Sequence, residues 1–195
     1  MKLSYATATT FETPSIVLSA TRGARTPLRS VEVSPPRDAR EWQAAARLIQ
    51  EFFAWIAERT GVDPQVVQEG IGEELSDLPG YYAEPHGRFF VARLDGEVVG
   101  TTGMRRMEEP GVVELKRVYI QPAARGHQLG AQLLEWALQS AREIGAHTVR
   151  LETAPLFMQN AVKLYRSYGF QEIENYTDLG NRVEGLLSME LRLRR

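Results

Sequence analysis

The sequence contains no cysteine, and this absence excludes a disulfide-stabilised fold, thiolate metal sites and a cysteine nucleophile. Long apolar runs are also absent: the longest uncharged one, residues 52–57, is far shorter than the roughly 20 residues that cross a bilayer. Neither sign of charge dominates, because the formal net charge is −2, so no general basic field attracts nucleic acid. We therefore expect a cytoplasmic globular protein without membrane or nucleic-acid partners.

The first 30 residues differ in composition from the rest of the chain. Glu12 is their only acidic residue, and four basic residues bring their net charge to +3. Rich in Ser and Thr and poor in acid, this segment resembles an organellar transit peptide, but it also fits an ordinary disordered extension. We adopt the second interpretation, and we predict an extension over residues 1–30 and one folded domain over 31–195.

Patterns typical of strands and helices alternate from residue 31 onward. Asp38 opens a helix that Gly61 ends, Asp63 opens another that ends at Gly80, and two more are expected over 129–143 and 157–168. The predicted strands cover residues 31–33, 88–94, 97–104, 112–120, 148–153, 170–176 and 186–193, with a type I′ hairpin at 95–96. This order predicts a single α/β (α+β) domain with a mixed central sheet of about six to seven strands flanked by about four helices.

A strand–loop–helix segment at residues 118–130 has features of a phosphate-binding site. The strand ends at Pro122, the loop carries Arg125-Gly126, and an amphipathic helix begins at once at Leu129. The first N–H groups of a helix lack intrahelical partners and lie at the positive end of its dipole, and glycine lets a ligand approach the backbone. The alternative is an ordinary strand-to-helix turn in which Gly126 provides clearance.

A second informative segment is the helix predicted over residues 157–168. Ala161, Leu164, Tyr165 and Tyr168 lie on one helical stripe, and Gly169 ends the helix. Taken alone, Tyr165 is best interpreted as a core tyrosine with a satisfied hydroxyl.

Together, the two segments resemble the GNAT superfamily of acyl-CoA N-acyltransferases. The motifs are Arg-Gly-x-x-Leu-Gly at residues 125–130 and Ala-x-x-Leu-Tyr-x-x-x-Gly-Phe at residues 161–170. The resemblance extends over nearly all of 31–195 and includes the hairpin and the closing strand pair. The strand Glu-Leu-Lys-Arg-Val-Tyr-Ile at residues 114–120 is most similar to a bacterial branch of the family.

The resemblance implies a GNAT-type fold and acetyl-CoA as the cosubstrate. In the family, the strand that matches Val118, Tyr119 and Ile120 diverges from its neighbour and binds the pantetheine arm. Tyr165 matches a tyrosine that acts as general acid and protonates the departing thiolate. The pyrophosphate would bind to the backbone of the loop and helix start that comprise Arg125, Gly126, His127, Gln128, Leu129, Gly130 and Ala131.

By the same resemblance, Glu114 is the best-placed general base, acting directly or through a water, because a primary amine must lose a proton before it attacks. The alternative is a structural ion pair between Glu114 and Lys116 or Arg106. Together with Arg105 and Arg117, these two basic residues form a set on two neighbouring strands. The set would either attract an acidic substrate group or lie on a solvated face.

Two positions depart from the family pattern. Gln128 stands where the family usually has glycine, so its side chain either points outward or weakens CoA binding. Met158 stands where an asparagine is frequent, and the nearby Asn160 is not its equivalent. His127 occupies a variable position and is expected to be exposed.

The function implied by the resemblance is direct, sequential transfer of an acetyl group from acetyl-CoA to a primary amine. Without cysteine, a thioester-enzyme intermediate is excluded. We expect no metal, because the three histidines show no ligand spacing. The alternative is a catalytically inactive acyl-CoA-binding sensor or scaffold domain. Relatives often dimerise, so a homodimer is conceivable, with the exposed side of Trp55 as one contact.

Overall fold

The computed structural model describes residues 29–60, 71–182 and 185–194. They contain a mixed seven-stranded sheet in the order β1-β2-β3-β4-β5-β7-β6. All neighbouring strands pair antiparallel except β4 and β5, which are parallel. The strands are β1 (Val31–Ser34), β2 (Gly87–Leu94), β3 (Glu97–Arg106), β4 (Val112–Ile120), β5 (Thr148–Thr153), β6 (Gln171–Ile173) and β7 (Leu187–Arg192).

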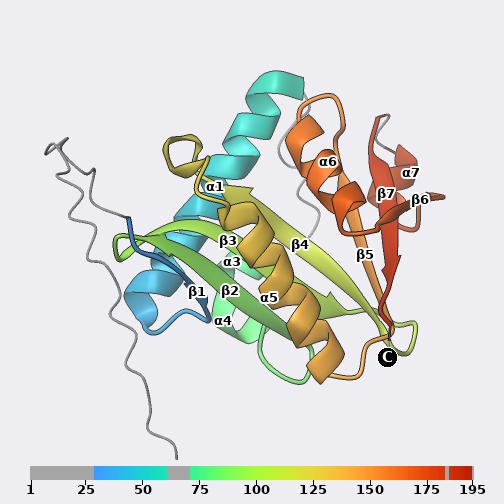
Figure 1. Ribbon diagram of the computed structural model, residues 1–195, viewed down its shortest axis with the longest axis horizontal. Helices are drawn as coiled ribbons and strands as arrows, with labels where there is room; N and C mark the ends of the chain where they lie inside the picture. Colours follow the sequence, from blue (N-terminus) through green and yellow to red (C-terminus); the bar gives the residue numbers. More distant parts are fainter. Residues whose placement is uncertain (1–28, 61–70, 183–184, 195) are drawn as a thin grey trace, which may run out of the picture.

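Helices cover both faces of this sheet (Figure 1). Within the described residues they are α1 (Ala39–Thr60), α3 (Ile71–Ser76), α4 (Leu78–Tyr81), α5 (Leu129–Glu143), α6 (Gln159–Ser167) and α7 (Asp178–Arg182), with a 3₁₀ turn, η1, at Pro122–Ala124. The α1 N-terminus has the predicted cap, because the Asp38 carboxylate accepts hydrogen bonds from the N–H groups of Arg40 (2.9 Å) and Glu41 (3.0 Å). The single-domain α/β fold and the mixed sheet are thereby confirmed.

Some predicted boundaries were wrong. The helix expected up to Gly80 is divided into α3 and α4, because the Asp77 carboxylate accepts a hydrogen bond from Gly80 N–H (3.0 Å) and starts a new turn. The strand expected over 170–176 ends at Ile173, and the unpredicted helix α7 follows. The Thr177 hydroxyl caps this helix, because it accepts a hydrogen bond from Gly180 N–H (2.9 Å). Residues 1–28 of the predicted extension and residues 63–70 of the second predicted helix lie outside the described residues.

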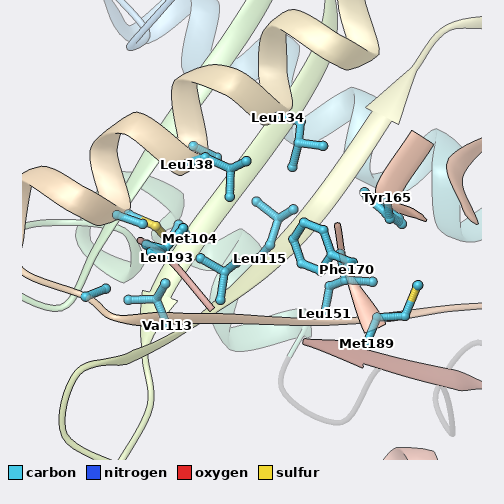
Figure 2. Packing of buried hydrophobic residues seen from close by; sticks show 14 residues of the cluster. Met104, Val113, Leu115, Leu134, Leu138, Leu151, Tyr165, Phe170, Met189 and Leu193 are labelled. Atoms are coloured by element: carbon cyan, nitrogen blue, oxygen red, sulfur yellow. The ribbon is translucent and has the colours of Figure 1, made fainter. Parts of the chain in front are cut away.

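Side-chain alternation along β2 separates the two packing layers. Phe89 and Val91 pack in one cluster with α1, whereas Phe90 and Ala92 pack in another with Leu133 of α5. A third cluster lies under α5 and α6, and Figure 2 shows it around Leu115 and Leu151 of the two parallel strands. Helices α5 and α6 therefore share one face of the sheet, and α1 covers the other.

The parallel pairing of β4 and β5 is short. Only residues 112–114 pair with residues 148–150, and Figure 1 shows the two strands diverging beyond this point. On its other side, β4 shifts register against β3 between Thr101 and Gly103. At this bulge Arg117 has a φ of +57°, and its carbonyl accepts a hydrogen bond from the Thr101 hydroxyl (2.8 Å). The bulge and the divergence leave a gap in the middle of the sheet.

Candidate active site

Two adjoining cavities open in the gap between β4 and β5. The Glu114 cavity, of about 240 Å³, is bounded by Glu114, Lys116 and Arg117 of β4 and by Glu152 of β5. The Arg125 cavity, of about 450 Å³, extends along the end of β4 to Arg125 and the start of α5. Their shared wall comprises Phe52, Val118, Leu156, Phe157, Met158, Ala161 and Tyr165.

Tyr165 lies where the two cavities meet. Its side chain comes from α6, is only 5% exposed, and packs against Phe170 with ring centroids 5.7 Å apart. Among the described residues, its hydroxyl has no hydrogen-bond partner. Burial raises the pKa of this phenol well above its ordinary value near 10, so it stays protonated at neutral pH. Tyr165 is thus part of the core, as the first interpretation expected, but no partner of its hydroxyl is found among the described residues, and its side chain also lines the gap.

The predicted pantetheine strand forms one wall of the Arg125 cavity. Val118, Tyr119 and Ile120 all line it, and their strand is unpaired on the side that faces β5. The Tyr119 hydroxyl donates a hydrogen bond to Glu51 of α1 (2.6 Å), which holds the strand against that helix. Trp55 also lines this cavity, and Arg59 lies 4.5 Å from its ring centroid. An extended ligand could therefore add to the free edge of β4.

The predicted pyrophosphate loop leads from this strand into α5. Gly126 and Gln128 both have left-handed backbones, with φ of +89° and +58°, and no side chain caps the helix start. The first N–H groups of α5, at Leu129, Gly130 and Ala131, are therefore available to an anion. The Gln128 side chain is exposed, which supports the first of its two expected placements.

Two other loop residues have structural contacts. The expectation of an exposed His127 was wrong: its imidazole is half-buried, because Nδ1 lies 3.1 Å from the Ala124 carbonyl oxygen and the ring folds onto the turn. The Arg125 side chain is exposed and its Nε lies 3.4 Å from the Ile120 carbonyl oxygen. Its guanidinium group places a positive charge at the rim of the cavity that bears its name.

Glu114 forms an ion pair with Lys116, as one of its predicted alternatives required. The Lys116 ammonium donates to Oε2 at 2.7 Å, and the Tyr176 hydroxyl donates to Oε1 at 3.2 Å. Arg106 is not its partner, since it donates to the carbonyl oxygens of Pro85 and Ile144 instead. Both carboxylate oxygens of Glu114 therefore already accept a hydrogen bond.

The predicted basic set does not act as one patch. Arg117 turns to Glu74, a fully buried carboxylate in α3, and donates to both of its oxygens (2.9 and 2.7 Å). Arg105 instead stacks on Tyr81, with the guanidinium carbon 3.9 Å from the ring centroid. Each of these cations therefore has its own partner.

Sequence reasoning missed two carboxylates near the gap. Glu74 neutralises Arg117 and also accepts a hydrogen bond from the buried Tyr82 hydroxyl (2.9 Å), and no local pattern marks that pairing. Glu152 lies in β5 and lines the Glu114 cavity. For Glu152 a signal existed: it alternates with the apolar residues of its strand, which places it on the face opposite Leu151.

The family model described as "Acetyltransferase (GNAT) family" matches residues 42–170, which is more than half of the chain. The chain belongs to the GNAT acetyltransferase family. Family membership confirms the predicted fold and the predicted class of enzyme, an acetyl-CoA-dependent acetyltransferase. The roles of individual residues stay predictions.

Relatives agree with this assignment. The chain is 30% identical to an uncharacterised N-acetyltransferase of Schizosaccharomyces pombe over 147 residues, which cover 75% of the chain and 85% of that protein. It is 41% identical to an IAA acetyltransferase of Azospirillum brasilense over 90 residues, which cover 46% of the chain and 58% of that relative. The names of these relatives do not identify the amine that this chain acetylates.

Solved structures share the fold. A putative acyl-CoA N-acyltransferase from Klebsiella pneumoniae superposes with a TM-score of 0.63 and 27% identity, covering 86% of this chain and 99% of that one. The PaiA N-acetyltransferase from Thermoplasma acidophilum, solved in complex with coenzyme A, gives a TM-score of 0.65 at 16% identity, covering 84% and 99%.

Two absences hold for the described part of the chain. None of its helices combines the length and the apolarity needed to cross a membrane. Within the same residues, no three His, Asp or Glu side chains gather closely enough to hold a metal ion.

Proposed function

We propose that this enzyme transfers an acetyl group from acetyl-CoA directly to a primary amine, with Tyr165 as the general acid. The observation that carries the proposal is the position of Tyr165, a buried side chain at the junction of two cavities whose hydroxyl has no hydrogen-bond partner among the described residues. The Arg125 cavity offers a free strand edge and a helix start, and the Glu114 cavity offers charged groups. Acetyl-CoA and the acceptor amine would therefore enter from opposite sides.

The Arg125 cavity suits the donor. The free edge of β4 at Val118–Ile120 supplies backbone groups for the amides of the pantetheine arm. The first N–H groups of α5 would bind the pyrophosphate, and Arg125 adds a positive charge at the rim. The thioester would then lie near Tyr165.

The transfer needs one bond to form and one to break. The amine nitrogen bonds to the thioester carbonyl carbon, and the bond from that carbon to sulfur breaks. Tyr165 gives its proton to the departing thiolate, and it regains one as the attacking nitrogen loses its surplus proton. Burial keeps Tyr165 protonated beforehand, because it raises the phenol pKa.

A carboxylate beside the gap must also accept a proton, because a primary amine with a pKa near 10 arrives as an ammonium ion. Glu114 is one candidate, and its pairing with Lys116 keeps it in the Glu114 cavity. The same pairing supports a second role for Glu114, in which it fixes the lysine and leaves the proton transfer to a neighbour.

The test has two steps. Acetyl-CoA at about 100 times its Kd should stabilise the domain by about 2.7 kcal/mol in a thermal-shift titration. Coenzyme A release should then be followed across a panel of amines with a thiol reagent. Binding and amine-dependent release support the proposal. No shift at millimolar acetyl-CoA overturns it, and binding without release from any amine identifies an acyl-CoA-binding domain that lacks catalysis.

A further inference from the structure

We propose that Glu152 receives the ammonium group of the acceptor, and that the acceptor is a cationic amine with no carboxylate beside its reacting nitrogen. This inference rests on the proposed function and adds the class of substrate. It concerns the Glu114 cavity, which Glu152 reaches from β5.

The surroundings of Glu152 leave half of its carboxylate free. Oε1 accepts hydrogen bonds from the Thr177 hydroxyl (2.6 Å) and the Ser188 hydroxyl (3.4 Å). Within the described residues, Oε2 has no hydrogen-bond partner, and no Lys, Arg or His nitrogen lies within 4.0 Å of the carboxylate. The side chain is only half-buried, so this oxygen can meet a ligand that enters the cavity.

Charges elsewhere along this cavity are already paired. Lys116 lies 2.7 Å from Glu114, and Arg117 lies 2.7 Å from Glu74. Among the described residues, Glu152 therefore carries the lining charge without an opposite partner, and with Glu74 counted against Arg117 these charges sum to one negative charge. An ammonium ion complements it. A carboxylate beside the reacting nitrogen would find no unpaired cation among the described residues of the cavity and would be repelled by Glu152.

The raised pKa of Glu152 also favours this role. Burial raises the pKa of its carboxyl and the nearby charge of Glu114 adds to the rise, whereas the hydrogen bonds from Thr177 and Ser188 and the charge of Lys116 oppose it. The neutral groups that face it are Thr177, before α7, and Ser188, on β7. A carboxylate with a raised pKa is a stronger base for an ammonium proton. As the pH falls through that pKa, Glu152 becomes neutral and loses both its attraction for ammonium and its capacity to accept a proton.

A second observation marks the same cavity as the place of reaction. The buried side chain of Tyr165 lines it, and its hydroxyl has no hydrogen-bond partner among the described residues. The proton balance of the transfer is then complete. The ammonium group gives one proton to Glu152, and the resulting neutral amine attacks the thioester. The net products are the amide, the free thiol of coenzyme A and one proton, which Glu152 passes to solvent.

The experiment compares amines on wild type and on Glu152→Gln. The amines are n-butylamine and 1,4-diaminobutane, which lack a carboxylate, and L-alanine and L-aspartate, which have one beside the nitrogen. We expect wild type to prefer the first pair by at least about tenfold in kcat/KM. Glu152→Gln should lower kcat/KM for that pair about 100-fold, leave the acetyl-CoA thermal shift unchanged and remove the acidic limb of the pH–rate profile.

Controls separate this inference from the proposed function. Glu143→Gln removes an ion-paired carboxylate at the far end of α5 and should leave kcat/KM unchanged. Glu152→Asp should recover part of the lost activity. A preference for the amino acids, or an unchanged rate in Glu152→Gln, overturns the inference while acetyl transfer itself stands. Failure to bind acetyl-CoA overturns the proposed function instead. If Glu152→Gln does not fold, the amine preference of wild type alone decides.

Discussion

Replacement of Tyr165 by phenylalanine isolates the chemical role of one oxygen atom. The ring and its contact with Phe170, 5.7 Å between centroids, are retained, and the hydroxyl has no partner among the described residues. Removal should therefore change the free energy of unfolding by less than about 1 kcal/mol, in either direction. A general acid contributes about 100-fold or more to a rate. We expect kcat to fall about 100-fold, which is about 2.7 kcal/mol of transition-state stabilisation.

The assay is the initial rate of coenzyme A release at saturating acetyl-CoA and amine. Because the chain contains no cysteine, a thiol reagent detects the product alone. Tyr168→Phe is the matched control, since its hydroxyl donates to Glu135 on the surface (2.7 Å) and should not affect kcat. A wild-type kcat in Tyr165→Phe, with acetyl-CoA affinity unchanged, would refute the assignment of the general acid.

Three further substitutions test the scaffold around the site. Gln128→Gly should raise the free energy of unfolding by up to about 1 kcal/mol in urea denaturation, because it relieves a left-handed backbone, and a loss of stability would contradict this. Glu41→Gln should lower the free energy of unfolding by about 3 kcal/mol, because Arg93, only 1% exposed, loses its nearer charged partner and keeps only the more distant Glu32 (3.7 Å). The Arg93 hydrogen bond lowers the pKa of Glu41. The stabilisation by the Glu41–Arg93 pair is therefore present above the unfolded pKa of about 4.3 and is lost as the pH falls through the folded pKa. In an acid titration, the difference in stability between wild type and variant should disappear over that range. Gly103→Ala should cost about 1–3 kcal/mol in the same urea assay, because the new methyl group would overlap the ring of Tyr82, and a wild-type midpoint would show that the ring can move.

Local patterns predicted those parts of the fold whose cause is local. Helix α5 and strand β4 have the predicted bounds, because periodicity and flanking turns fix them. The hairpin at Asp95-Gly96 has two positive φ values, 54° and 86°, as a type I′ turn requires. The prediction failed where a side chain intervened, as at Asp77, whose carboxylate starts a new helical turn.

The candidate site was predictable in outline only. Tyr165 and the loop at Arg125 were found through two motifs, each contained in a short segment, residues 161–170 and 125–130. The pairing of Arg117 with Glu74 spans 43 residues, and no short segment contains both partners. The charge balance of the Glu114 cavity depends on such pairs, so it became visible only when the sheet and α3 were in place.

Because the parallel pairing between β4 and β5 is short, the domain has an unpaired strand edge at the centre of its sheet. Beyond residues 112–114 and 148–150, each strand stays paired only with its outer neighbour, β3 or β7. Most proteins have such edges at the periphery, where they are covered or blunted against unwanted pairing. In a hydrogen-exchange map, protection should therefore drop in the middle of the sheet rather than at its rim. A ligand that adds to β4 would close this break, and the centre of the domain would become its slowest-exchanging part.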